Sequence, residues 1–215
     1  MKTLFVTLVF AMFSMAGFSQ KDQFEITMKS SIDKMFQSKT IDEYQLSANT
    51  FERISMAEKK QWLPSYYAGY CYIMMAFMTD KPDQIDPWLD VAQKQIDNAQ
   101  TITSSEPELL VLQGMLHQAR IGVDFMARGM KYSQMAQESL NQALAMDSDN
   151  PRAYYLLGMN LLSTPKMFGG GPQVALPLFQ KAQNKFNSFK PADELMPQWG
   201  EENNLAMLKE CEKNN

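Results

Sequence analysis

The chain has 215 residues, of which 45% are hydrophobic and 20% charged, so its composition is that of a folded globular domain and not of a disordered segment. Its formal net charge of −4 argues against the basic surface that nucleic-acid binding requires. The length fits one domain.

The first nineteen residues have the pattern of a secretory signal peptide. Lys2 precedes an apolar run over residues 3–16, and Gly17-Phe18-Ser19 then offers the small-x-small pattern of a cleavage site, so we expect cleavage after Ser19. No Cys follows this run, which argues against a lipoprotein, and no later stretch is long enough to span a membrane. We therefore expect a periplasmic or secreted mature chain without a membrane span.

Three later segments repeat one pattern of small, large and small residues at offsets 0, 4 and 7. These offsets place the three side chains on a single face of a helix, where the small residues allow a neighbouring helix to approach. A looser copy is Ser47-x3-Phe51-x2-Ile54. The three copies are Ala92-x3-Ile96-x2-Ala99, Ala136-x3-Leu140-x2-Ala143 and Ala175-x3-Phe179-x2-Ala182.

A second type of predicted helix carries a glycine in its interior. Glycine inside a helix costs about 1 kcal/mol relative to alanine, so its repetition indicates close contact between helices. Each glycine follows the first small residue of the preceding segment by 22 residues, from Ser47 to Gly69, from Ala92 to Gly114 and from Ala136 to Gly158.

This alternation of a glycine helix with an A-x3-F helix resembles the tetratricopeptide repeat. From each glycine to the next small residue the separation is 23, 22 and 17 residues, compared with about 12 in the ordinary repeat. We expect the additional residues of the first two pairs to lengthen each helix by about one and a half turns.

The resemblance implies an all-α, tetratricopeptide-like solenoid in a single domain over residues 20–215. We expect antiparallel helix pairs at about 24–57, 62–103, 107–147 and 151–187, closed by a capping helix at 201–213. Asp86-Pro87, Asn150-Pro151 and a capping box from Ser105 to Glu108 read as helix starts, and Gly129 reads as the break between two long helices.

The resemblance also implies which residues line the concave face of the solenoid. This surface is rich in Tyr and Met, which suit adaptable recognition, but the same residues also suit a filled core, and the pattern leaves both interpretations open. Glu108 and Arg152 are expected at its rim, where they would orient a partner. The implied binding residues are Leu63, Tyr66, Tyr70, Ile73, Val111, Met115, Arg152, Tyr155, Met159 and Leu162.

The loop formed by Phe168, Gly169, Gly170 and Gly171 is the second candidate site, either as a tight connector or as a lip that contacts a ligand. Together with Pro197-Gln198-Trp199-Gly200, it gives a weaker resemblance to the periplasmic tetratricopeptide component of tripartite ATP-independent (TRAP) transporters.

The histidine, the two cysteines and the methionines are expected to have structural roles. His117 is the one histidine and is expected to pack between helices. Cys71 and Cys211 are interpreted as separate thiols, with a disulfide as the alternative. Fifteen of the 18 methionines follow the signal peptide, and most of these are interpreted as core filler. No catalytic motif and no metal-ligand spacing occurs, so we expect neither enzymatic activity nor a cofactor.

The sequence thus predicts an exported, non-enzymatic binding or adaptor protein whose concave groove holds a protein or peptide partner. The alternative is a chamber for a small apolar or lipid-like ligand, associated with a transporter.

Overall fold

The computed structural model describes residues 21–213, and the predicted signal peptide lies outside this range. Within it the secondary structure is entirely helical, which confirms the all-α class. No helix of the described part is long and apolar enough to cross a membrane.

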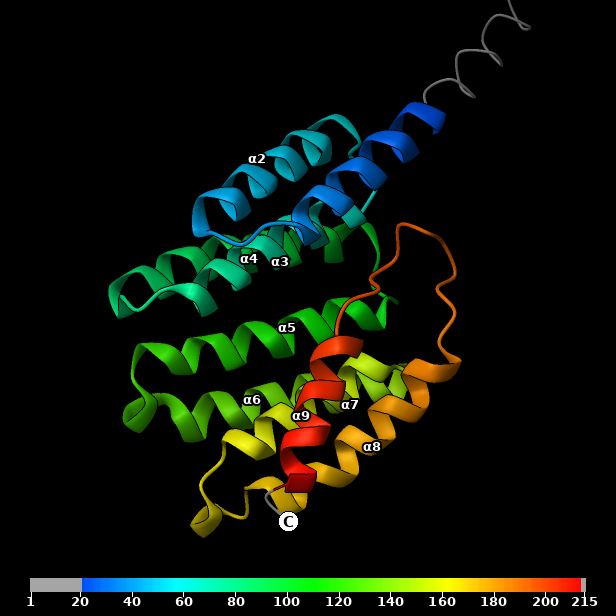
Figure 1. Cartoon of the computed structure of the whole chain (residues 1–215). Coiled ribbons are helices and arrows are strands. Elements are labelled where there is room, and N and C mark those ends of the chain that lie inside the picture. The colour runs from blue at the N-terminus through cyan, green and yellow to red at the C-terminus, as the bar shows by residue number, and fades with distance from the viewer. Residues whose placement is uncertain (1–20, 214–215) are drawn as a thin grey trace, which may run out of the picture.

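Sequential antiparallel pairs build the fold, stacked in chain order with a last helix against the final pair (Figure 1). A first helix over residues 21–36 precedes α2. Two short 3₁₀ turns, η1 (Ile121–Val123) and η2 (Lys166–Phe168), lie within pairs. The helices are α2 (Ile41–Ala57), α3 (Leu63–Met78), α4 (Pro82–Ile102), α5 (Pro107–Arg120), α6 (Phe125–Met146), α7 (Pro151–Ser163), α8 (Pro172–Ser188) and α9 (Glu201–Lys213).

The small and large residues of the repeated pattern pack between helices as expected. Ile96, Leu140 and Phe179 are fully buried, as are the six alanines beside them. The helix glycines differ, however. A Cβ atom on Gly114 would lie 2.7 Å from Leu140, and one on Gly158 would lie 2.6 Å from Phe179, whereas the nearest contact for Gly69 is an ordinary 3.4 Å.

Three of the predicted helix boundaries are wrong. Pro87 lies inside α4, which begins at Pro82, because the first turn of this helix extends farther back than the Asp-Pro pattern indicates. Gly129 lies within α6, and the chain instead turns over residues 121–124, where Asp124 caps the helix by accepting from the Ala127 amide at 2.9 Å.

The predicted capping box at Ser105 is also absent, since α5 begins at Pro107 and its first turn has no side-chain cap. In contrast, Asn150 caps α7 as expected, with its side chain accepting from the Ala153 amide at 3.0 Å.

The additional length falls mainly on the second helix of each pair. The second helices α4 and α6 have 21 and 22 residues, while their partners α3 and α5 have 16 and 14. The expected equal lengthening is therefore wrong. Because α6 is so much longer than α5, its N-terminal turns extend beyond it, and a Cβ atom on Gly129 would meet nothing within 4 Å.

Helix α9 packs against α8 at the C-terminal end of the stack. Asn204 is fully buried there and donates to the Phe179 carbonyl at 3.1 Å. Cys71 and Cys211 are both buried free thiols, as the interpretation of separate thiols requires.

Candidate functional site

The residues expected to line the concave face are largely buried in the structure. Met159 and Leu162 on α7 are half-buried. The other eight are buried, and four of them have exposed fractions of 2% or less. These eight are Leu63, Tyr66, Tyr70, Ile73, Val111, Met115, Arg152 and Tyr155.

The segment over residues 189–200 covers part of this surface. In Figure 1 it leaves the end of α8, extends toward the N-terminal helices and turns back into α9. Trp199 Nε1 donates to the Tyr66 hydroxyl at 2.9 Å, and the Tyr67 hydroxyl donates to the Leu195 carbonyl at 2.7 Å. The Trp199 ring also lies 5.5 Å from that of Tyr70. The chain itself therefore occupies a surface that the sequence offers to a partner.

Glu108 and Arg152 do not lie at a rim, so that expectation is wrong. Both are buried and form an ion pair in which the Arg152 Nη2 and Glu108 Oε1 atoms are 2.8 Å apart. Asn150 Nδ2 donates to the same carboxylate at 2.5 Å, and the Arg152 guanidinium lies 4.5 Å from the Phe189 ring centroid. The pair consequently ties α5 to α7 and to the covering segment.

Burial also controls the ionisation of the concave-face tyrosines. It raises the pKa of Tyr155 to about 12 and that of Tyr66 well above its ordinary value. Both phenols are therefore neutral at physiological pH and serve as apolar surface with a hydrogen-bonding group.

His117 is packed between helices, as the sequence predicts. Its ring stacks with that of Tyr132 at 6.1 Å between centroids, and its Nε2 atom lies 3.2 Å from the Gln113 amide nitrogen. Its Nδ1 atom is buried and has no hydrogen-bond partner among the described residues. Burial, together with the charge of Arg120, lowers the pKa of His117 to about 4, so the imidazole is neutral at pH 7.

The glycine loop between α7 and α8 has a defined conformation. Gly169 and Gly171 have positive φ angles of 84° and 113°, and the Gly171 amide donates to the Leu161 carbonyl at 2.8 Å. A Cβ atom on Gly170 would lie only 2.0 Å from the Thr164 carbonyl oxygen. This compact turn presents Phe168 to solvent.

The turns within the pairs α3–α4, α5–α6 and α7–α8 lie on one side of the stack (Figure 1). Several apolar residues in or near these turns are exposed. We call this set the turn edge. Met126 is 89% exposed, Met167 83% and Met130 77%, so these three are exceptions to the expectation that most methionines fill the core. The turn edge consists of Phe77 and Met78 at the end of α3, Phe125, Met126 and Met130 at the start of α6, and Met167 and Phe168 in η2.

Contacts between elements hold these turns together. Gly122 in η1 lies against Ile85 of α4, and the Ser133 hydroxyl of α6 donates to Asn160 of α7 at 3.1 Å. Arg128 on α6 pairs with Asp86 on α4 at 2.8 Å. For Phe125, Met126 and Met130, the signal in the sequence is the length of the second helix, because apolar residues that extend past the partner helix find nothing to pack against.

Two basic side chains of α6, Lys131 and Arg128, lie next to the turn-edge residues in the sequence. The Lys131 ammonium lies 5.2 Å from the centroid of the Tyr132 ring, and the Arg128 guanidinium lies 5.9 Å from it. The edge can thus offer apolar, aromatic and cationic contacts to one ligand. Within residues 21–213, no group of three or more His, Cys, Asp or Glu side chains is arranged to hold a metal ion.

No family model matches this chain, and no curated protein matches it. The described residues form an all-helical fold with an exposed apolar surface. Among solved structures, the chain is similar to the HusA haemophore from Porphyromonas gingivalis, with a TM-score of 0.80 and 29% sequence identity. The match covers 89% of this chain and 94% of that one.

Proposed function

We propose that this chain, as a single mature domain over residues 20–215, is an exported, non-enzymatic binding protein for a small, flat, largely apolar ligand of the haem class. The observation that carries the proposal is the similarity to a haemophore at 29% identity over nearly the whole length of both chains. Haem is here a cargo and not a resident cofactor.

This proposal favours the small-ligand alternative over the peptide groove. A peptide on the concave face would have to displace residues 189–200 and break the hydrogen bond between Trp199 and Tyr66. The association with a transporter, and the weaker resemblance to a TRAP component, remain predictions.

We place the ligand at the turn edge. A porphyrin is a flat apolar ring with carboxylate groups, so it is matched by aromatic side chains, adaptable thioethers and a nearby cation. Phe125 and Phe168 supply rings, Met126 and Met130 supply thioethers, and Lys131 supplies the charge. Exposed apolar patches of this kind commonly mark binding surfaces.

His117 does not extend this surface, because it is only 9% exposed and stacks with Tyr132. The proposal therefore depends on apolar and aromatic contacts and not on a preformed set of metal ligands.

The test is a titration of the mature chain with haemin, followed by the Soret absorbance. We expect saturable binding that weakens at least tenfold in a Met126→Ser, Met130→Ser, Phe168→Ser variant. These side chains are exposed, so helicity should not change.

The matched control replaces three other exposed apolar residues, which belong to the first pair, as Ile26→Ser, Leu46→Ser and Met56→Ser. It should bind haemin like the unaltered chain. Equal affinities in all three proteins would refute the turn edge as the site, and an absence of saturable binding would refute the function.

A further inference from the structure

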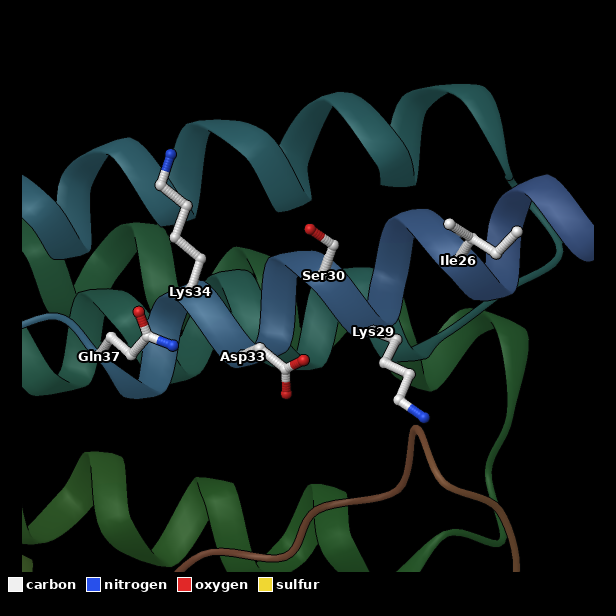
Figure 2. Close-up of a pocket in the computed structure, with 6 residues that line it drawn as sticks. All are labelled: Ile26, Lys29, Ser30, Asp33, Lys34 and Gln37. Atoms are coloured by element: carbon white, nitrogen blue, oxygen red, sulfur yellow. The ribbon is translucent and has the colours of Figure 1, made fainter.

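Two hollows adjoin along the first helix and share Ser30 and Lys34. The smaller one, of about 460 Å³, is lined by residues of this helix alone (Figure 2). The larger one, of about 670 Å³, lies between the first helix and α2 and has the size of a small-molecule site. Its lining residues are Ser30, Ser31, Lys34, Leu46, Ser47, Asn49, Thr50, Glu52, Arg53 and Met56.

Arg53 differs from the other arginines of the chain. Arg120, Arg128 and Arg152 each form an ion pair with a carboxylate. For Arg53, the hydrogen bond found among the described residues goes to the Thr50 hydroxyl, at 3.3 Å, and none of the ion pairs between described residues involves Arg53. A planar guanidinium without a carboxylate partner is well suited to bind an oxyanion through two hydrogen bonds.

Lys34 supplies a second cation from the opposite wall. Figure 2 shows Lys34 and Ser30 pointing toward α2, whereas Asp33 and Lys29 point toward the segment over residues 189–200. Lys29 is neutralised by Glu194, at 2.6 Å, but no carboxylate pairs with Lys34 within the described range.

The acidic residue of the hollow is already engaged. Glu52 Oε1 accepts hydrogen bonds from the Tyr72 hydroxyl and from Gln95 Nε2, both at 3.1 Å, which directs this oxygen toward α3 and α4. The larger hollow therefore combines two cations and one hydrogen-bonded carboxylate with hydroxyl and amide groups.

Its rim also has an apolar part. Leu46 is 62% exposed and Met56 73%, one on each side of Arg53 along α2. A small inorganic anion would leave both side chains in water, whereas a ligand with an apolar body would cover them.

We propose that this hollow binds a small amphiphile whose head is a carboxylate or a phosphate. Arg53 and Lys34 hold the anionic head, the Ser30 hydroxyl donates a further hydrogen bond to it, and Leu46 and Met56 cover the apolar chain. The site is separate from the turn edge and does not depend on the function proposed above.

The probes are octyl phosphate and octanoate, measured by calorimetry and, for the phosphate, by ³¹P NMR. We expect saturable binding of one or both, reduced at least tenfold in a Lys34→Gln, Arg53→Gln variant. A Lys94→Gln, Lys209→Gln variant has the same net charge but changes exposed lysines elsewhere, and it should bind like the unaltered chain.

Circular dichroism confirms that each variant is folded, and the choice between the two probes identifies the head group. Equal weakening in both variants would overturn the proposal, because it would show a general charge effect, as would an absence of saturable binding. Haemin affinity should be unchanged in the Lys34→Gln, Arg53→Gln variant. A parallel loss would contradict the assignment of two separate sites.

Discussion

At the scale of single residues, the interior glycines show how closely the helices approach one another. Gly158 faces the ring of Phe179, which is fully buried and cannot move away easily. An added methyl group in a filled core costs about 1–3 kcal/mol, while alanine returns about 1 kcal/mol of helix propensity. Gly69 has room for a Cβ atom at ordinary contact distance.

We therefore predict that Gly158→Ala lowers the free energy of unfolding by about 1–2 kcal/mol. Gly69→Ala should leave it unchanged or raise it by up to about 1 kcal/mol. Urea denaturation of both variants measures these changes in the free energy of unfolding. Equal destabilisation of the two variants would show that the contact with Phe179 does not cause the loss in Gly158→Ala.

The buried ion pair gives a larger effect. Arg152→Met removes the partner of a buried carboxylate, and we expect a loss of about 3–5 kcal/mol of stability because Glu108 is left uncompensated. Glu108→Gln combined with Arg152→Met removes both charges and should recover part of this loss. A double-mutant cycle by chemical denaturation measures the coupling, and additive effects of the two changes would contradict it.

The lowered pKa of His117 makes the stability of the fold depend on pH. Its pKa is about 4 in the folded chain and 6.5 in the unfolded chain, so between these values only the unfolded state binds the proton. Stability is then lost as the pH falls, by about 2 kcal/mol between pH 7 and pH 5. Urea unfolding at both pH values should show this loss reduced in His117→Gln, and an equal loss in both proteins would contradict the prediction.

At the scale of elements, the sequence predicts the helices well because their packing face repeats at fixed spacing. Ile96, Leu140 and Phe179 recur between small residues, and all three lie in the core. Helix ends are predicted less well, because residues that are typical of a helix start also occur inside helices or in tertiary contacts. Pro87 is accommodated in the second turn of α4, and Glu108 binds Arg152 instead of capping α5.

The turn between α7 and α8 is an element whose shape depends on its glycines. Gly170→Ala would place a methyl group against the Thr164 carbonyl, so the turn must rearrange and Met167 and Phe168 must move. We predict weaker haemin binding with unchanged helicity. Gly69→Ala, where a Cβ atom would lie at ordinary contact distance and away from the turn edge, is the control and should bind normally. Unaltered affinity in Gly170→Ala would exclude the turn from the site.

At the scale of the whole molecule, the sequence does not decide whether the concave face is open. Tyr66 and Tyr155 suit a groove and a core equally well, and the choice depends on contacts such as that of Trp199 with Tyr66, between residues 133 positions apart. The turn edge was missed for a related reason. Met126 and Met130 have the pattern of packed residues, and only the unequal lengths of α5 and α6 leave them exposed.

The most direct test of the account is to map the ligand by NMR, using zinc protoporphyrin with the isotope-labelled mature chain. We predict amide shift changes centred on residues 77–78, 125–130 and 166–169, with little change around Tyr66, Tyr155 and Trp199. Changes centred instead on those three concave-face residues would contradict the placement of the ligand at the turn edge.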